Sequence, residues 1–169
     1  HDFRVAYVFS YSDRALPLHF LLSSFYAGQE GSFLFWALCT ALFALPLASF
    51  ARKREDEPWV MTVYMGVMTG LLMLVAAKSP FRPLWDVIPD APVGVMPADG
   101  RGLNPLLQNF WMVIHPPVLF IGFAAMAAPF SLAIAGLWKK DLDILTMRGL
   151  PWVLTAVALL GLGIMLGGY

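Results

Sequence analysis

Four long apolar stretches without a charged side chain constrain the fold of this 169-residue chain more than any other feature. They cover residues 33–51, 59–77, 118–138 and 150–168. Each is close to the ~20 residues that a helix needs to cross ~30 Å of hydrocarbon. Because backbone groups inside lipid must find partners within the protein, helix is the expected conformation. The pattern predicts an all-α, polytopic integral membrane protein with four transmembrane helices and short interfacial helices between them.

Composition supports this class and excludes several others. Charged residues make up only 13% of the chain, against about 25% in a soluble domain. Eleven basic and eleven acidic residues cancel, so the chain lacks the basic excess of a nucleic-acid-binding protein. The single cysteine excludes a disulfide framework and a multi-cysteine metal site. Because the chain begins with His1 and stops at Tyr169 on an apolar run, we expect it to be a piece of a longer membrane protein.

The short turns between the apolar stretches predict the orientation. Basic residues cluster at 52–54 and again within 139–148, and short basic loops stay in the cytoplasm. The protein should therefore lie in the inner membrane of a bacterium, with residues 1–32 and 78–117 on the periplasmic side. The predicted organisation has four parts. An interfacial segment covers residues 1–32, and two transmembrane helices follow over 33–77. A periplasmic loop covers 78–117, and two further transmembrane helices cover 118–169.

The two periplasmic segments carry weaker structural signals. Residues 3–9 alternate between apolar and polar side chains, which indicates a short extended piece. Residues 16–26 are amphipathic and should lie along the membrane surface. Residues 78–102 are rich in Pro, Asp and Gly and should be irregular.

The end of the long loop holds the most informative pattern. Asn104 is a favourable N-cap and Pro105 a favourable first residue for a short helix with one strongly apolar face. We expect Pro116 to exclude a helical conformation at His115, and Pro117 suits the start of the next helix. We therefore expect His115 at a rigid corner, where the interfacial helix ends and the third transmembrane helix begins.

An imidazole fixed at that boundary has three possible uses: a metal ligand, a proton carrier or a plain interfacial polar group. A proton relay would need ionisable residues inside the spans, and the four stretches have none. A zinc site would need three or four ligands at regular spacing, which the sequence does not offer. A haem needs a flat apolar platform and one or two axial ligands, commonly histidine. Aromatic residues beside one anchored histidine fit haem better than any other cofactor.

The run 102–109, Gly-Leu-Asn-Pro-Leu-Leu-Gln-Asn, followed by Val-Ile-His-Pro-Pro at 113–117, resembles the signature of CcmF-type proteins. These are haem lyase subunits of cytochrome c maturation and include the NrfE-like relatives. Gly-Gln-Glu-Gly-Ser at 28–32 and the segment 2–18 also resemble this family. Two places depart from its pattern. Tyr26 stands where family members usually carry Trp, and His19 lies in a stretch that in the family usually reads aromatic then Lys. We interpret His19 as an interfacial residue.

The resemblance implies a function that the residues alone do not. Family members hold haem b, as a substrate, on the outer membrane face between two histidines, and His115 matches the first. The resemblance implies that Trp111, Asn104, Gln108, Pro116 and Pro117 form the platform and position the ligand. The second axial ligand, the Trp-rich haem-handling run and the histidines of a second, buried haem would lie beyond Tyr169.

The implied partners are a CcmE-like haem chaperone, apocytochrome c, CcmH/CcmI-like subunits and membrane lipid, with no nucleic acid. The implied activity is part of a haem lyase that attaches haem to a Cys-x-x-Cys-His motif by thioether bonds. No catalytic residue is predicted in this chain, because the apocytochrome thiols attack the haem vinyl groups. Two alternatives stay open: a transmembrane haem transporter, and a structural assembly subunit of the same complex.

Overall fold

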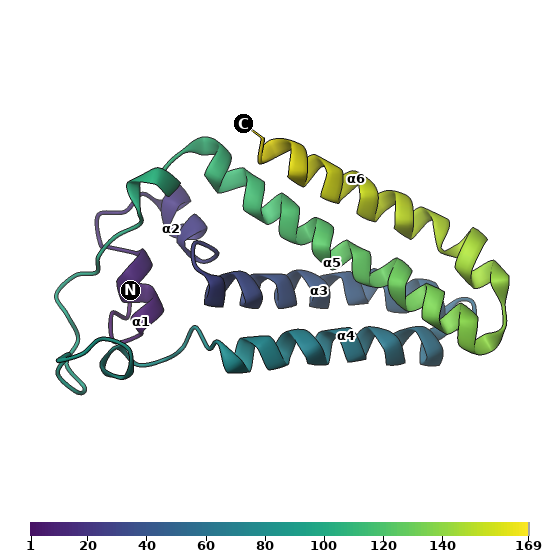
Figure 1. Cartoon of the computed structure of the whole chain (residues 1–169), viewed down its shortest axis with the longest axis horizontal. Coiled ribbons are helices and arrows are strands. Elements are labelled where there is room, and N and C mark those ends of the chain that lie inside the picture. The colour runs from purple at the N-terminus through teal and green to yellow at the C-terminus, as the bar shows by residue number, and fades with distance from the viewer. Residues whose placement is uncertain (169) are drawn as a thin grey trace. The chain divides into compact units, whose positions relative to one another are not determined.

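The structure is a computed structural model that describes residues 1–168, except for the side chain of Leu145. It is helical, and the described residues contain no strand beyond one isolated bridge between Val5 and Pro83. Figure 1 shows the order of the elements. The longer helices are α1 (Ala6–Tyr11), α2 (Leu18–Ser24), α3 (Gln29–Arg52), α4 (Glu57–Ala77), α5 (Phe110–Lys139) and α6 (Leu150–Leu166). Single turns lie at η1 (Leu84–Asp86), η2 (Pro105–Leu107) and η3 (Ile144–Arg148).

The long apolar helices confirm the predicted class, an all-α multi-pass membrane protein. Among the described residues, α3, α4 and α5 are long and apolar enough to cross a bilayer, and α6 is a shorter apolar helix of 17 residues. All four predicted stretches are therefore helical. The helices also extend beyond the predicted starts, since α3 begins at Gln29 and α5 at Phe110.

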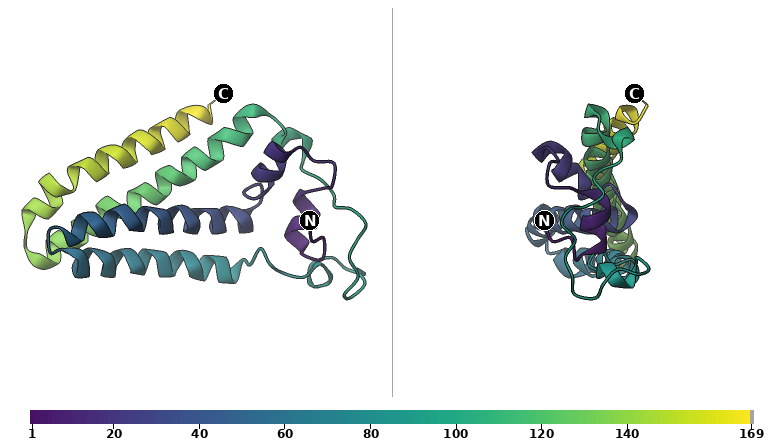
Figure 2. Two further views of the ribbon diagram at one scale, coloured as in Figure 1. Left: turned by 180° about the vertical axis from the view of Figure 1, so that it is seen from behind. Right: turned by 90° about the vertical axis from the view of Figure 1, so that its left-hand side faces the viewer.

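The chain forms two compact units, and the larger part of the four long helices makes up the second, residues 36–73 and 115–168. Within it, α3 and α4 run antiparallel side by side, and so do α5 and α6, in both Figure 1 and Figure 2. The core is built on Leu47, Val60, Tyr64 and Leu132, which are almost fully buried. The Tyr64 hydroxyl donates a 2.7 Å hydrogen bond to the Thr40 carbonyl, so the one polar atom of this ring is paired inside the apolar core.

One buried carboxylate joins the turns at one end of this second unit. Asp56 precedes α4, and its side chain is 2% exposed. It accepts hydrogen bonds from Lys139 Nζ at 2.5 Å and from Arg148 Nη1 at 2.6 Å. Arg148 also lies 3.8 Å from Asp141. Lys139 and Arg148, two of the basic residues that predict the orientation, are therefore paired with Asp56 from the turn before α4.

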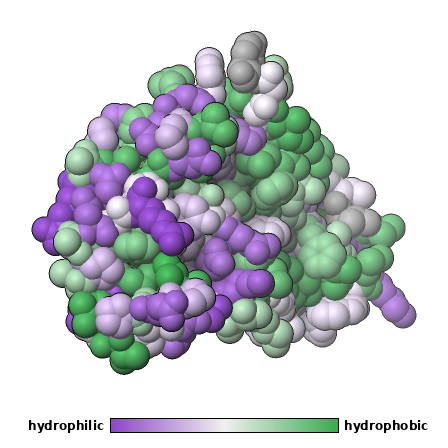
Figure 3. All heavy atoms as spheres, turned by 60° about the vertical axis from the view of Figure 1, so that its left-hand side comes forward, coloured by the Kyte–Doolittle hydropathy of each residue, from purple (hydrophilic) through white to green (hydrophobic). Residues whose placement is uncertain are grey.

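The first unit, residues 1–35 and 74–114, contains the short helices and the long loop. The predicted amphipathic segment is helical, as α2. The extended piece predicted for residues 3–9 is wrong, because Ala6–Tyr11 is α1. Its alternation has a different cause: Val5 pairs with Pro83, and Phe3 is buried. In Figure 3 hydrophilic residues gather over this unit.

Candidate functional site

His115 lies within α5 rather than at a corner between two helices. The helix runs without interruption from Phe110 to Lys139 and includes Pro116 and Pro117, so the predicted break at His115 is wrong. The chain turns instead at Gln108, where φ is −88° and ψ is 57°. A following proline disfavours the helical conformation without forbidding it, and prolines are tolerated in membrane helices where other groups satisfy the freed backbone carbonyls.

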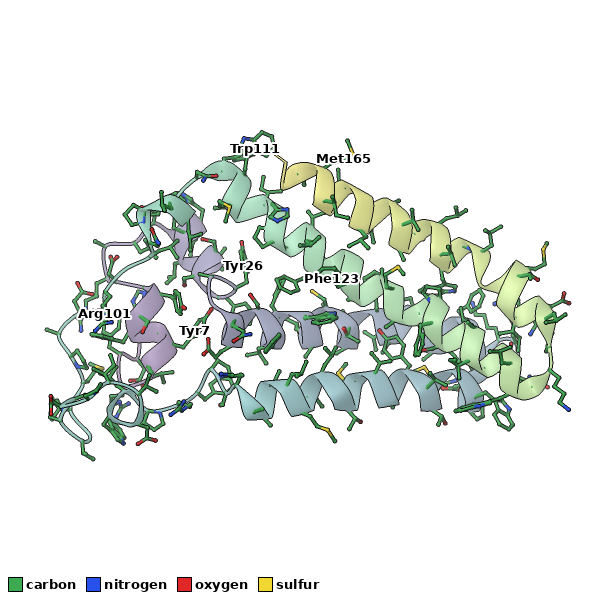
Figure 4. The ribbon with its side chains drawn as sticks, viewed as in Figure 1. Tyr7, Tyr26, Arg101, Trp111, Phe123 and Met165 are labelled. Atoms are coloured by element: carbon green, nitrogen blue, oxygen red, sulfur yellow. The ribbon has the colours of Figure 1, made fainter. Side chains whose placement is uncertain are left out.

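One of those carbonyls has a visible partner. A proline has no N–H, so Pro117 leaves the carbonyl of Val113, four residues earlier, without its helical donor. The Tyr26 hydroxyl donates a 2.7 Å hydrogen bond to that oxygen. Burial raises the pKa of Tyr26, which keeps the hydroxyl protonated and able to donate. Tyr26 therefore stabilises the first turns of α5 from the chain between α2 and α3 (Figure 4).

The His115 ring is oriented by α6. Its Nδ1 lies 2.8 Å from the carbonyl oxygen of Gly163, and the residue is half-buried. A carbonyl only accepts hydrogen bonds, so Nδ1 must carry the proton. In the neutral ring the lone pair is then on Nε2. Because none of the hydrogen bonds among residues 1–168 uses Nε2, His115 can act as one ligand to a metal centre.

Glycines of α5 and α6 let these two helices approach each other closely. A Cβ at Gly167 would lie 2.6 Å from His115 Cε1, and a Cβ at Gly163 would lie 2.8 Å from the Leu119 Cα. A Cβ at Gly122 would lie 2.7 Å from the Leu160 Cα. These distances leave no room for a side chain, as in the small-residue contacts of membrane helices. Gly163 and Gly167 therefore lie in the close contact between α6 and α5.

The other predicted site residues divide between the two units. Pro116 and Pro117 belong with His115 in the second unit, whereas Asn104, Gln108 and Trp111 belong to the first. Asn104 caps η2, as predicted, by accepting a 3.0 Å hydrogen bond from the Leu106 N–H.

The remaining two of these side chains lie on either side of the start of α5. Gln108 donates a 2.7 Å hydrogen bond to the Leu103 carbonyl. Trp111 projects from the first turn of α5, 41% exposed, with its ring against Phe110 (Figure 4). The two amides, of Asn104 and Gln108, therefore shape the segment that leads into α5, and Trp111 offers a partly exposed apolar surface.

Sequence reasoning missed three residues that support the region around His115: Gly163, Gly167 and Tyr26. Gly163 and Gly167 carry a recognisable Gly-x-x-x-Gly spacing, but nothing in the sequence indicates which side chain packs against them. A proline in a helix interior frees a carbonyl that needs a donor, but no local pattern indicates that Tyr26 supplies it. Among residues 1–168 no three His, Cys, Asp or Glu residues lie together as a metal site.

Comparison with known proteins identifies related sequences along the entire chain. Residues 26–169 match the family model described as cytochrome C assembly protein. The chain is 37% identical over 99% of its length to "Cytochrome c-type biogenesis protein CcmF" of Pseudomonas fluorescens and 33% identical over 99% to that of Escherichia coli. It is 31% identical over 99% to "Cytochrome c-type biogenesis protein NrfE" of Haemophilus influenzae.

These relatives are much longer than the chain. It spans about a quarter of their length, with coverage of 25%, 25% and 26% in the same order. No solved structure is significantly similar to it.

Proposed function

The chain belongs to the cytochrome c assembly protein family, and from this premise we propose that it is part of a haem-handling subunit of cytochrome c maturation. The subunit binds haem at the periplasmic face of the bacterial inner membrane and positions it for covalent attachment to apocytochrome c. Residues 1–32 and 78–117 face the periplasm in this proposal. Haem is the substrate, delivered by a haem chaperone, and the second axial ligand lies outside this chain.

The geometry of His115 is the single observation that carries the proposal. Its Nδ1 is engaged by the Gly163 carbonyl at 2.8 Å, which leaves Nε2 as the coordinating nitrogen. Hydrogen bonding of the second ring nitrogen is how proteins orient a metal-binding histidine and raise its basicity. The absence of a side chain at Gly167 leaves the room that this ring occupies, because a Cβ there would lie 2.6 Å from His115 Cε1.

The chemistry assigned to the subunit is positioning. Each apocytochrome thiol adds across one haem vinyl group, its sulfur to one carbon and its hydrogen to the other, so no leaving group departs. The protein therefore needs no nucleophile of its own. It holds the haem edge in reach of the thiols, which converts an encounter in solution into a reaction between aligned groups.

The experiment compares His115→Ala with His19→Ala in the full-length protein. His19 lies in α2 and has no predicted ligand role, so it is a matched control. We expect His115→Ala to lose the absorbance of the haem at the periplasmic face and to lose mature cytochrome c while its membrane level stays normal, and His19→Ala to keep both. Added imidazole should restore haem binding to His115→Ala. Normal cytochrome c output from a stably inserted His115→Ala would contradict the proposal.

The same material separates the two alternatives. Movement of haem across a vesicle membrane by the complete protein would favour a transporter. Retention of partner proteins without haem absorbance in the purified wild type would favour a structural assembly subunit.

A further inference from the structure

The first unit contains a cavity of about 220 Å³ that the proposed function does not use. Its walls come from α1, from the first turn of α3 and from the chain just after α4. The residues with polar groups that line it are Tyr7, Ser10, Tyr11, Glu30, Ser79 and Arg82. A space of this size holds one small polar group rather than a drug-sized ligand.

Two opposite charges line this cavity without neutralising each other. Glu30 lies in the first turn of α3 and makes no ion pair among the described residues. The helix dipole favours a carboxylate there, but its oxygens still accept hydrogen bonds. Arg82 makes no ion pair in the same set, and its Nη2 donates to the neutral carbonyl of Asp86 at 3.2 Å. A ligand that carries both a cation and an anion would satisfy both groups.

Two tyrosines add a neutral aromatic wall. The Tyr7 and Tyr11 ring centroids lie 4.6 Å apart, inclined at 41°. The Tyr7 hydroxyl accepts a 2.9 Å hydrogen bond from the Gly28 N–H and lies 3.2 Å from the carbonyl oxygens of Ser24 and Phe25. Burial, followed by the neighbouring Tyr11 and Glu30, raises the pKa of Tyr7, so the ring stays neutral. Aromatic faces beside a carboxylate are suited to an ammonium group.

The position of the cavity identifies the environment of its ligand. Its lining residues lie where α3 begins at Gln29 and just beyond the end of α4 at Ala77. Both helices are long and apolar enough to span a bilayer. The ends of spanning helices lie at the level of the polar headgroups. Phospholipid headgroups are therefore the charged groups that are most concentrated around this cavity.

We propose that this cavity binds the phosphoethanolamine headgroup of a membrane phospholipid. The primary ammonium lies against Glu30 and the two tyrosine rings, and the phosphate is held by Arg82. A primary ammonium donates three hydrogen bonds, whereas a choline headgroup donates none. A glycerol headgroup has no cation for Glu30. The site should therefore select phosphatidylethanolamine over both phosphatidylcholine and phosphatidylglycerol.

The test uses the full-length protein, delipidated in detergent and titrated with phosphatidylethanolamine, phosphatidylcholine or phosphatidylglycerol of identical acyl chains. Native mass spectrometry counts the lipids bound at each concentration. The variants are Glu30→Gln, which removes the partner of the ammonium, and Arg82→Gln, which removes the partner of the phosphate. The matched controls are Glu57→Gln, in the first turn of α4, and Arg101→Gln, an arginine of the same unit; neither control residue lines the cavity.

We expect wild type and both controls to prefer phosphatidylethanolamine by about tenfold, the equivalent of one charged hydrogen bond. Glu30→Gln should lose the preference, and Arg82→Gln should bind all three lipids more weakly. Because Arg82 is exposed, its variant remains informative if Glu30→Gln does not fold. Equal binding of the three lipids by wild type would overturn the proposal, as would unchanged selectivity in Glu30→Gln.

A competition arm distinguishes the lipid from a soluble source of the same chemistry. Free O-phosphoethanolamine should displace the lipid only at concentrations far above that of the lipid. Displacement at equal concentration would overturn the lipid as the ligand.

Discussion

His115 is held from two sides by α6, through the Gly163 carbonyl and through contact of its ring with Gly167. A histidine that is free to rotate would lose side-chain entropy on binding a metal. Here that loss is already incurred when α5 and α6 pack. The orientation of Nε2 is therefore a property of the helix pair and not of His115 alone.

Replacement of Gly167 by Ala tests this dependence. Its Cβ would lie 2.6 Å from His115 Cε1, so the ring or α6 must shift, which disturbs the hydrogen bond between His115 and the Gly163 carbonyl. We expect Gly167→Ala to reduce haem retention by about tenfold in the full-length protein, the effect usual for loss of an outer-shell partner of a metal ligand. The control is Gly161→Ala on the same helix, where a Cβ meets nothing within 4 Å. Equal haem content in the two variants would contradict the prediction.

Replacement of Tyr26 by Phe tests the support of the first turns of α5. The change removes the donor to the Val113 carbonyl and keeps the ring. We expect a loss of about 1 kcal/mol in the free energy of unfolding, the usual net value of one hydrogen bond. Thermal unfolding in detergent measures the change. The control is Tyr11→Phe, whose hydroxyl makes no hydrogen bond within the described residues, and an equal loss of stability in both variants would contradict the prediction.

At the scale of elements, the turn before α4 and the ends of α5 and η3 are joined by one carboxylate. Asp56 is 2% exposed and contacts Lys139 and Arg148, which are 26% and 31% exposed. Removal of one partner from a buried ion pair leaves the remaining charges uncompensated. The loss should be moderated here because water screens the two partly exposed cations.

We therefore expect Asp56→Asn to lower the free energy of unfolding by about 2 kcal/mol, below the full value for a buried pair. Chemical denaturation in detergent measures it. Asp141→Asn is the matched control, because Asp141 lies 3.8 Å from Arg148 and is itself partly exposed. A smaller effect for Asp56→Asn than for Asp141→Asn would show that the cluster does not hold the turns.

How far the elements could be predicted depends on whether their signal is local. The four apolar stretches predict helices because lipid allows almost no alternative, and the cap at Asn104 follows from its own side chain. The extended piece predicted for residues 3–9 is wrong because their alternation does not reflect a strand. It reflects the pairing of Val5 with Pro83 and the burial of Phe3, which are contacts with other parts of the chain. The prediction of a corner at His115 is wrong because α5 continues through Pro117. The hydrogen-bond donor to the freed Val113 carbonyl comes from Tyr26, which is far away in the sequence.

At the scale of the whole molecule, the direction in which the chain crosses the membrane stays a prediction. It rests on the basic turns at 52–54 and 139–148, and two of those basic residues are paired with Asp56. Neutralised residues contribute less to orientation after folding, but insertion occurs before these ion pairs form. The periplasmic assignment of residues 1–32 and 78–117 is thus open to a direct test.

Single cysteines in a full-length protein from which all other cysteines, Cys39 included, have been replaced by serine provide that test. We expect Asp90→Cys, in the long loop, to react with a membrane-impermeant maleimide added from the periplasmic side. Glu55→Cys, in the turn between α3 and α4, should react only after the membrane is opened. The reverse pattern would put His115 at the wrong face for the proposed haem site, and so would reject both assignments together.

The site as a whole is predictable only in part. The motif around His115 gives the family, and the comparisons establish it over the whole chain. The contacts of His115 with Gly163 and Gly167 depend on how α5 meets α6, and no local pattern specifies that register. The cavity at Glu30 depends likewise on three segments that are distant in the sequence.

The hydrogen bond from Tyr26 to Val113 has a consequence for how the sequence can vary. The Val113 carbonyl that Pro117 leaves unpaired needs a hydrogen-bond donor at position 26, and the kind of aromatic ring that carries the donor is secondary. Tyrosine supplies it from an oxygen, and tryptophan could supply it from an indole nitrogen. Exchange between these two aromatics should therefore be neutral over evolutionary time. Phenylalanine, their near neighbour in size and apolarity, should be tolerated only in lineages that have also lost the second proline.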